Sequence, residues 1–249
     1  MNNKVAIITG AAGGLGKAVA HLLADKGHRV MMVDNRRDAL EDLNESLKSN
    51  GADCDCIQAD LIDVGGYASL VSETIARFGG IDILVNAAAI LDRKDIYEVT
   101  PTYFDRVFSV NARAIFFISR AVMAEMSKNG WGRIVNCTSV GVYQGGNTMT
   151  SIVYEGTKGA VSVLTKMFAS YGASKGILVN TVCPAGMKSR LQSREHTPQH
   201  MVDMTLNTIP LKRMCEPVEV ARMVEWLVSE ENTYATGATF DVVGGRVMN

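Results

Sequence analysis

The chain has 249 residues, 47% of them hydrophobic, and a formal net charge of -1. This length and hydrophobic content are enough to bury one large core, so we expect one domain over residues 1–249. The near-zero charge, without a basic stripe, excludes nucleic acid as an expected partner. No apolar run approaches the roughly 18 residues of a membrane span, and the N-terminal run is too short for a signal sequence. We therefore expect a cytoplasmic protein that binds no membrane, with five scattered cysteines as free thiols.

Short β-branched runs alternate with longer helical segments, which is the pattern of a parallel sheet covered on both faces. Strands are predicted at residues 5–9, 29–34, 53–59, 81–87, 132–138, 178–183 and 239–243. Helices are predicted near residues 14–26, 36–49, 64–78, 101–128, 152–174 and 217–229. Right-handed crossovers then give a doubly wound α/β (Rossmann) fold with strand order 3-2-1-4-5-6-7. The stretches 140–151 and 186–210 have no clear strand or helix role and follow strand ends, where such sheets bind ligands.

A glycine-rich turn, Thr9-Gly10-Ala11-Ala12-Gly13-Gly14-Leu15-Gly16, follows the first predicted strand and opens the first predicted helix. Such a turn lets a pyrophosphate approach the backbone and rest on the helix N-terminus, although similar turns also occur for packing. Asp34 ends the second strand, where a carboxylate can accept both ribose hydroxyls of NAD and repel a 2′-phosphate. It could also cap the next helix, a compatible role. Arg36 and Arg37 could instead clamp the 2′-phosphate of NADP.

A second cluster contains Tyr154 and Lys158, which share one face of a predicted helix. The ammonium group is expected to lower the phenol pKa from about 10 toward working pH. With the glycine turn, this pair favours hydride transfer between a nicotinamide and an alcohol or carbonyl. Tyr171 and Lys175 repeat the spacing, but lie roughly 25 Å further along the same helix. We expect that second pair to be structural.

These motifs are part of a broader similarity: the chain resembles the short-chain dehydrogenase/reductase family over nearly its whole length. The resemblance implies a catalytic tetrad of Asn111, Ser139, Tyr154 and Lys158. In this family's terms Ser139 holds the substrate oxygen and Tyr154 moves the proton. Lys158 tunes Tyr154 and binds the nicotinamide ribose, and Asn111 holds a water in the proton relay. The matching positions are Thr9-Gly10, Asp60-Leu61, Asn86-Ala87-Ala88, Asn111, Ser139, Tyr154, Lys158, Val179-Asn180, Pro184, Thr236-Gly237 and Val243-Gly244-Gly245.

The resemblance also implies the contacts of a bound NAD. It places Asp60 beside the adenine, Asn86 as support of the central strand near the cofactor, and residues 182–189 on the nicotinamide side. The expected cofactor-binding residues are Gly10, Gly14, Leu15, Gly16, Asp34, Asp60, Leu61, Asn86, Ala87, Tyr154, Lys158, Pro184, Gly186, Met187 and Ser189.

The chain departs from the family pattern at three places. The family usually reads Asn-Ala-Gly where residues 86–89 read Asn-Ala-Ala-Ala, which adds a methyl group near the cofactor. It usually reads Pro-Gly where this chain has Pro184-Ala185, with Gly186 one place later. The interval from Ser139 to Tyr154 is also longer than usual. We place the extra residues in the 140–153 loop, where they would reshape the pocket wall and leave the tetrad intact.

The stretch 187–210 is expected to act as a lid over the substrate. His196 and His200 could bind a metal if helical, but no third ligand is evident, so no metal is expected. Met201, Met204, Leu206 and Ile209 could equally pack the lid or line the pocket. Both candidate walls are polar, which favours a small polar substrate. The polar residues expected there are Tyr143, Gln144, Asn147, Thr148, Lys188, Arg190, Gln192, Arg194 and His196.

Taken together, the sequence predicts an NAD(H)-dependent oxidoreductase that interconverts a secondary alcohol and a ketone, such as a polyol, sugar or hydroxy acid. An NADPH-dependent 3-oxoacyl reductase is the alternative within enzymes, because the stretch 210–220 also resembles that group. A nucleotide-sensing protein without catalysis is the alternative outside them, and the complete tetrad argues against it. The family resemblance further implies a homotetramer built partly from the helices 101–128 and 152–174.

Overall fold

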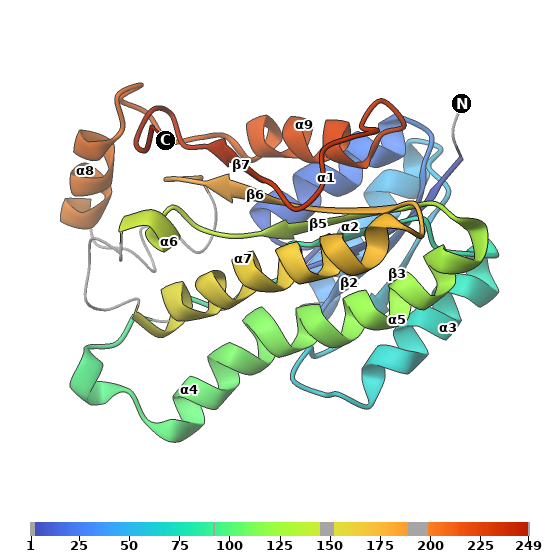
Figure 1. The fold of residues 1–249 in the computed structure, drawn as a ribbon, viewed down its shortest axis with the longest axis horizontal. Coiled ribbons are helices and arrows are strands. Elements are labelled where there is room, and N and C mark those ends of the chain that lie inside the picture. Colours follow the sequence, from blue (N-terminus) through green and yellow to red (C-terminus); the bar gives the residue numbers. More distant parts are fainter. Residues whose placement is uncertain (1–2, 92, 145–151, 189–198, 249) are drawn as a thin grey trace.

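The computed structural model describes residues 3–91, 93–144, 152–188 and 199–248, and its centre is a seven-stranded sheet (Figure 1). The strands are β1 (Val5–Thr9), β2 (Arg29–Asp34), β3 (Cys54–Gln58), β4 (Ile83–Asn86), β5 (Gly132–Cys137), β6 (Ile177–Pro184) and β7 (Thr239–Val242). They pair in the order β3-β2-β1-β4-β5-β6-β7, all in parallel. The predicted fold class and strand order are therefore confirmed.

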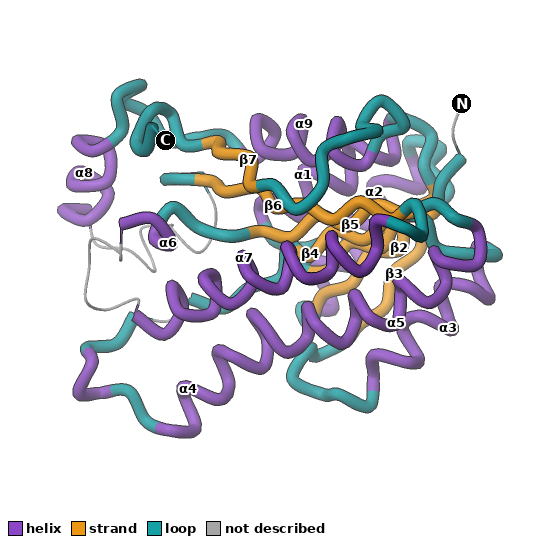
Figure 2. The backbone as a smooth tube through the Cα atoms, in the orientation of Figure 1, coloured by secondary structure: helices purple, strands orange, loops and turns teal. Residues whose placement is uncertain are grey.

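Helices cover both faces of the sheet (Figure 1, Figure 2). One face carries α1 (Gly14–Asp25), α2 (Arg37–Ser49) and α9 (Pro217–Val228). The other carries α3 (Gly66–Phe78), α5 (Ala114–Asn129) and α7 (Ile152–Ala173). All residues of β1 and β4 are buried, as expected for central strands covered on both sides.

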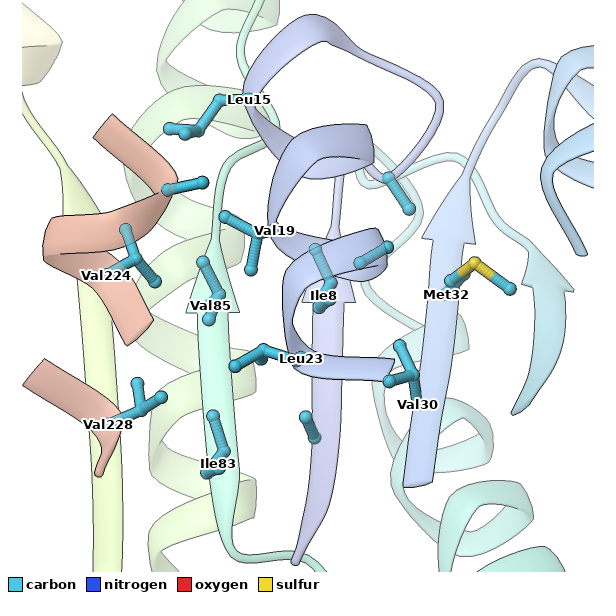
Figure 3. Close-up of a cluster of buried hydrophobic side chains, with 14 of the residues drawn as sticks. Ile8, Leu15, Val19, Leu23, Val30, Met32, Ile83, Val85, Val224 and Val228 are labelled. Carbon is cyan, nitrogen blue, oxygen red and sulfur yellow. The ribbon is translucent and has the colours of Figure 1, made fainter. Parts of the chain in front are cut away.

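The core on the α1 face fixes the end of β1 against the start of α1 (Figure 3). Ile8 and Val85 from the sheet join Val19 of α1 and Val224 of α9 in one buried cluster. Burying side chains of this size stabilises the fold by about 1.5–3 kcal/mol each. This packing holds the glycine turn that lies between β1 and α1.

The helix predicted over residues 101–128 is interrupted in the structure. It consists of α4 (Pro101–Phe108), a π-helical turn (Ser109–Arg113) and α5. Turns of this kind are frequent at functional sites. By length and composition the run Pro101–Asn129 could cross a membrane, but 61% of its most apolar window is buried inside the protein. It packs against α3 and α7, as a core helix does.

Three short elements were not predicted from the sequence. They are a 3₁₀-helix (Ile96–Glu98), α6 (Gly141–Gln144) and α8 (Gln199–Thr208). Their mixed polar sequences lack the periodic apolar pattern that a helix needs to be recognised. The stretch 186–210, expected to have no regular structure, therefore contains α8, which Figure 1 shows at the same end of the molecule as α6 and the C-terminus.

Candidate active site

A cavity of about 550 Å³ opens along the carboxyl ends of the central strands. Its size is that of small-molecule and cofactor sites, and its place is where doubly wound sheets bind ligands. Asn86 and Asn111 do not line it, and Ser189 lies outside the described residues. The expected site residues that do line it are Gly10, Gly14, Leu15, Gly16, Asp34, Asp60, Leu61, Ala87, Ser139, Tyr154, Lys158, Pro184, Gly186 and Met187.

The glycine turn brings two strand ends together at one side of the cavity. Gly10 has φ +68°, and a Cβ atom there would lie 2.6 Å from the Cα atom of Ala88. A Cβ atom on Gly16 would overlap the carbonyl group of Gly10. The helix α1 begins at Gly14, and no side chain caps it. An uncapped helix N-terminus beside bare backbone fits a dinucleotide pyrophosphate.

Asp34 ties this turn to the end of β2 and is 8% exposed. Its Oδ2 accepts a hydrogen bond from the Ala12 N–H at 3.0 Å, and its Oδ1 accepts from the Arg36 N–H at 3.0 Å. The N-cap of α2 is Arg36, so Asp34 does not cap that helix itself. The Nε atom of Arg36 also lies 3.3 Å from Oδ1, whereas Arg37 turns away to pair with Glu41 at 2.8 Å. Arg36 therefore lines the cavity and Arg37 does not.

Asn86 lies at the end of β4, but its side chain points away from the cavity into a buried polar network. Its Nδ2 donates to Oδ1 of Asn136 at 2.8 Å, and Nδ2 of Asn136 donates to Oγ1 of Thr165 at 2.8 Å. Asn86 thus joins β4 to β5 and, through Thr165, to α7. This geometry suits a residue that supports the cofactor site from behind.

Ser139, Tyr154 and Lys158 converge on the cavity from the end of β5 and the first turns of α7. Lys158 is 1% exposed, and its Nζ donates to the carbonyl oxygen of Cys137 at 2.7 Å. The same Nζ lies 5.3 Å from the centre of the Tyr154 ring. The hydroxyl of Ser139 accepts from the Gly141 N–H at 3.2 Å, which fixes the serine at the cavity wall.

Burial, and not the lysine, dominates the ionisation of Tyr154. Loss of water around the phenol raises the pKa of Tyr154 well above its ordinary value, and nearby Arg93 only partly opposes this. Burial also lowers the pKa of Lys158. The expectation that Lys158 lowers the pKa of Tyr154 is thus wrong for the protein without bound ligands. The free-energy cost of ionising the phenol away from water is larger than the stabilisation that the ammonium group of Lys158 provides, since that group already donates to the Cys137 carbonyl.

Asn111 lies in the π-helical turn and is completely buried. Its Oδ1 accepts from the Ile90 N–H at 2.9 Å, and its Nδ2 donates to the Ile90 carbonyl at 3.0 Å. Nδ2 also lies 3.2 Å from Oγ1 of Thr157. The amide therefore clamps the loop after β4 to α7, and its side chain does not reach the cavity.

The loop after β6 explains one departure from the family pattern. Ala185 is buried, while Gly186 has φ +56° and lines the cavity. The glycine that stands one residue later than in the family pattern is thus in the left-handed conformation, which glycine adopts without strain. Met201 and Met204 of α8 line the cavity, which answers the question left open for them. Ile209 is instead buried beneath the loop.

Sequence reasoning missed four charged residues in the cavity wall: Arg93, Arg106, Glu155 and Arg246. They belong to the loop after β4, to α4, to α7 and to the segment after β7. Two polar residues expected in the wall do not line it: Tyr143 donates to Asp241, and Gln144 donates to the Arg246 carbonyl. A signal that could have found Glu155 is its charge inside the Tyr-Lys motif, and for Arg93 and Arg246 it is charge in the loops that follow strand ends.

Several other expectations can be placed. Tyr171 lies outside the cavity, with Lys175 against its ring, but it is 63% exposed and so does not pack at the helix end as expected. Lys188 does not line the cavity and pairs with Glu216. Within the described ranges, no three His, Cys, Asp or Glu side chains gather as metal ligands. The expected wall residues Asn147, Thr148, Arg190, Gln192, Arg194 and His196 lie outside the described residues.

Comparisons with known proteins agree with this geometry. A family model described as Enoyl-(Acyl carrier protein) reductase matches residues 10–246. Versicolorin reductase 1 of Aspergillus parasiticus is 36% identical, covering 98% of this chain and 97% of its own. A Brucella melitensis 3-ketoacyl-(acyl-carrier-protein) reductase complexed with NADH has a TM-score of 0.89 at 29% identity, over 98% of both chains.

A structure from Beutenbergia cavernae, of a putative NAD(P) dependent gluconate 5-dehydrogenase with bound NADP, has a TM-score of 0.91 at 29% identity. That match covers 98% of this chain and 96% of the other. The likeness extends over the whole of each protein, so it includes the glycine turn, the sheet and the Tyr154 helix together. The chain therefore belongs to the short-chain dehydrogenase/reductase family and is an NAD(P)-dependent oxidoreductase.

Proposed function

We propose that the protein interconverts a secondary alcohol and a ketone with NAD(H), and that its substrate is small and polar. One observation carries this proposal: a single cavity joins the glycine turn and Asp34 at one end to Ser139, Tyr154 and Lys158 at the other. Binding both reactants in one cavity converts a bimolecular reaction into an oriented one.

The residues have complementary roles in this reaction. When bound, the nicotinamide supplies or accepts the hydride. The Ser139 hydroxyl holds the substrate oxygen, and the Tyr154 hydroxyl donates a proton to that oxygen during ketone reduction. Because burial raises the pKa of Tyr154, the phenol is neutral and ready to donate. The buried ammonium group of Lys158 then stabilises the phenolate that remains, and Asn111 holds the loop and helix in register.

The choice of NAD rests on Asp34. Its carboxylate faces the cavity at the ribose end, where it would repel a 2′-phosphate. Arg36 offsets part of this charge, since its Nε lies 3.3 Å from the carboxylate. Two of the related structures hold NADH and NADP, so the family accommodates both forms. In this chain the Asp34 carboxylate accepts two backbone hydrogen bonds and is held in place more firmly than the partly exposed Arg36 guanidinium, which favours NAD.

An NADPH-dependent reductase of 3-oxoacyl or larger ketones is the second candidate. Arg36 favours it, because the side chain lines the cavity and is 34% exposed, so it could turn toward a 2′-phosphate. A ketoacyl reductase and versicolorin reductase 1 are also among the relatives. The charged wall of the cavity and the name of the gluconate relative support the smaller polar substrate instead. A non-catalytic nucleotide sensor would not need Ser139, Tyr154 and Lys158 together.

We further propose a cytoplasmic homotetramer in which residues 1–249 act as one domain. Val163, Met167 and Tyr171 form an exposed apolar stripe along α7, at 60%, 64% and 63% exposure. A stripe of this kind on a long helix suits a subunit interface. The segment near 187–210 would act as a lid, since Met201 and Met204 of α8 already line the cavity.

The test is an assay of the purified protein with NAD⁺ and NADP⁺ against polyols, sugars, hydroxy acids, steroids and simple alcohols, and in the reverse direction with 3-oxoacyl thioesters. We expect the highest kcat/KM with NAD⁺ and a small polar alcohol. Efficient turnover of bulky apolar ketones or acyl thioesters with NADPH, and none of the polar panel, would establish the second candidate.

A further inference from the structure

Three charged side chains that the tetrad does not use meet at the substrate end of the cavity. They are Arg93, Glu155 and Arg246, and each lines the cavity. In each, one buried atom has no hydrogen-bond partner among the described residues: Nε of both arginines and Oε2 of Glu155. A buried polar atom without a partner is costly, so the convergence of three such atoms in one cavity wall points to a ligand that completes them.

Local packing holds Glu155 in this wall. The carboxyl group lies against Gly141, and a Cβ atom at that position would overlap it. Glu155 directly follows Tyr154 and interacts with the hydroxyl of Ser139. Its free oxygen is therefore next to the two residues proposed to hold the reacting oxygen of the substrate.

The two arginines are within range of the Glu155 charge but do not form ion pairs with it. Among the described residues, no ion pair joins either guanidinium to that carboxylate. Arg93 also senses the charge of Tyr154, so it lies close to the reacting centre. Arg93, Arg246 and Lys158 line this wall together with Glu155, and Arg106 lines the same cavity. The local charge is positive, which favours an anionic ligand.

We infer that the substrate is a small hydroxylated carboxylate, with its carboxylate bound by Arg93 and a second hydroxyl donating to Glu155. This inference rests on the proposed function, because it places the reacting carbon at Tyr154. Because Arg93 and Tyr154 line the same cavity and interact electrostatically, a carboxylate bound by Arg93 shares this part of the cavity with the carbon that is oxidised or reduced. The charge of Arg246 also acts on Glu155 and favours the ionised form of that carboxylate as a hydrogen-bond acceptor.

An apolar substrate of similar size does not fit this wall. It would leave Nε of both guanidinium groups and Oε2 of Glu155 buried without partners. A guanidinium also provides a planar pair of donors that matches a carboxylate better than it matches a neutral carbonyl. The arrangement therefore selects for charge as well as for size.

The experiment compares acids with their neutral amides. Lactate, glycerate and 3-hydroxybutyrate are assayed against lactamide, glyceramide and 3-hydroxybutyramide, with NAD⁺, in the unmodified protein and in Arg93→Leu, Arg93→Lys and Glu155→Gln. We expect at least one acid to exceed its amide tenfold or more in kcat/KM. Arg93→Leu should remove this preference through KM, and Arg93→Lys should restore part of it. Glu155→Gln should lower kcat/KM more for glycerate, which has a second hydroxyl, than for lactate.

Binding is measured separately from turnover, by calorimetry with the same acids in the presence of NADH. Arg222→Leu, an exposed arginine on α9, is the control and should change neither binding nor turnover. Dinucleotide affinity in every variant checks that the fold is intact.

Absence of saturable binding for every acid, or equal kcat/KM for acids and amides, overturns the anion site even if neutral alcohols are turned over. Binding of acids that needs Arg93, without turnover of any substrate, overturns the proposed reaction and leaves the anion site standing. A preference for glycerol phosphate over every acid overturns the carboxylate assignment.

Discussion

The two ends of the cavity satisfy their polar groups in opposite ways. At the ribose end, Asp34 accepts two backbone hydrogen bonds and holds the glycine turn in place. At the substrate end, Arg93, Glu155 and Arg246 each keep a buried atom without a partner among the described residues. The first end is prepared by the protein's own backbone, whereas the second is left for the ligand to complete. This difference fits a fold that binds one common cofactor and many different substrates.

The largest effect is expected from Tyr154→Phe, which removes the proposed acid from between the two ends. General acid catalysis contributes about 10²–10⁴-fold, so turnover should fall roughly 10³-fold. Dinucleotide affinity should stay unchanged, because the glycine turn and Asp34 are untouched. Steady-state kinetics and NADH fluorescence titration measure the two quantities. Tyr171→Phe should behave as the unmodified protein, and near-normal turnover by Tyr154→Phe would refute the mechanism.

The preformed backbone at the ribose end can be tested with Gly10→Ala. The left-handed φ costs an alanine about 1–2 kcal/mol. The overlap of its Cβ with Ala88 adds about 1–3 kcal/mol. We expect a large loss of unfolding free energy in urea and weaker dinucleotide binding. Gly27→Ala is the matched control, since Gly27 also has a positive φ, +81°, but nothing within 4 Å of its Cβ position. Equal losses in the two variants would show that the close approach of the strands is unimportant.

Asp34→Ala tests the fixed charge at the same end. A carboxylate near a 2′-phosphate is repelled by about 1–4 kcal/mol, depending on the local dielectric. We expect the NAD⁺ to NADP⁺ ratio of kcat/KM to fall about tenfold or to invert, with Arg36 then free to bind the phosphate. Asp38→Ala, an exposed change on α2, should leave the ratio unchanged. A ratio that already favours NADP⁺ in the unmodified protein would contradict the assignment.

The smallest effect concerns the incomplete substrate end. Burial raises the pKa of Glu155, and Ser139, Lys158, Arg246 and Arg93 only partly oppose this. Ionised Glu155 therefore destabilises the folded protein. This cost appears as the pH rises above the ordinary carboxyl pKa and is complete above the raised pKa of Glu155 in the folded protein. Glu155→Gln should raise Tm of the ligand-free protein near neutral pH by roughly 2–4 °C, for about 1 kcal/mol.

Below the ordinary carboxyl pKa this gain should vanish, because Glu155 is then neutral in both states. Glu73→Gln, on the exposed side of α3, is the control and should show no pH-dependent gain. Thermal unfolding over a pH series, without ligand, measures both variants. A stability loss in Glu155→Gln near neutral pH would mean that the charge is already compensated in the folded protein.

Much of the fold was determined by the sequence alone. Buried strands such as β1, the amphipathic helices between them and the parallel order follow from local periodicity and from right-handed crossovers. The glycine turn and the spacing of Tyr154 and Lys158 are also local, because one turn or one helix face brings the residues together. The two motifs could be predicted because each depends on residues only a few positions apart in the chain.

Only the tertiary structure decided the character of the substrate end. Arg93, Glu155 and Arg246 are far apart in the chain and meet because the ends of β4 and β7 and the start of α7 pack at one edge of the sheet. Packing likewise turns Asn86 away from the cavity and raises the pKa of Tyr154 by removing water. Burial and long-range convergence depend on the whole fold, and no local pattern of residues encodes them.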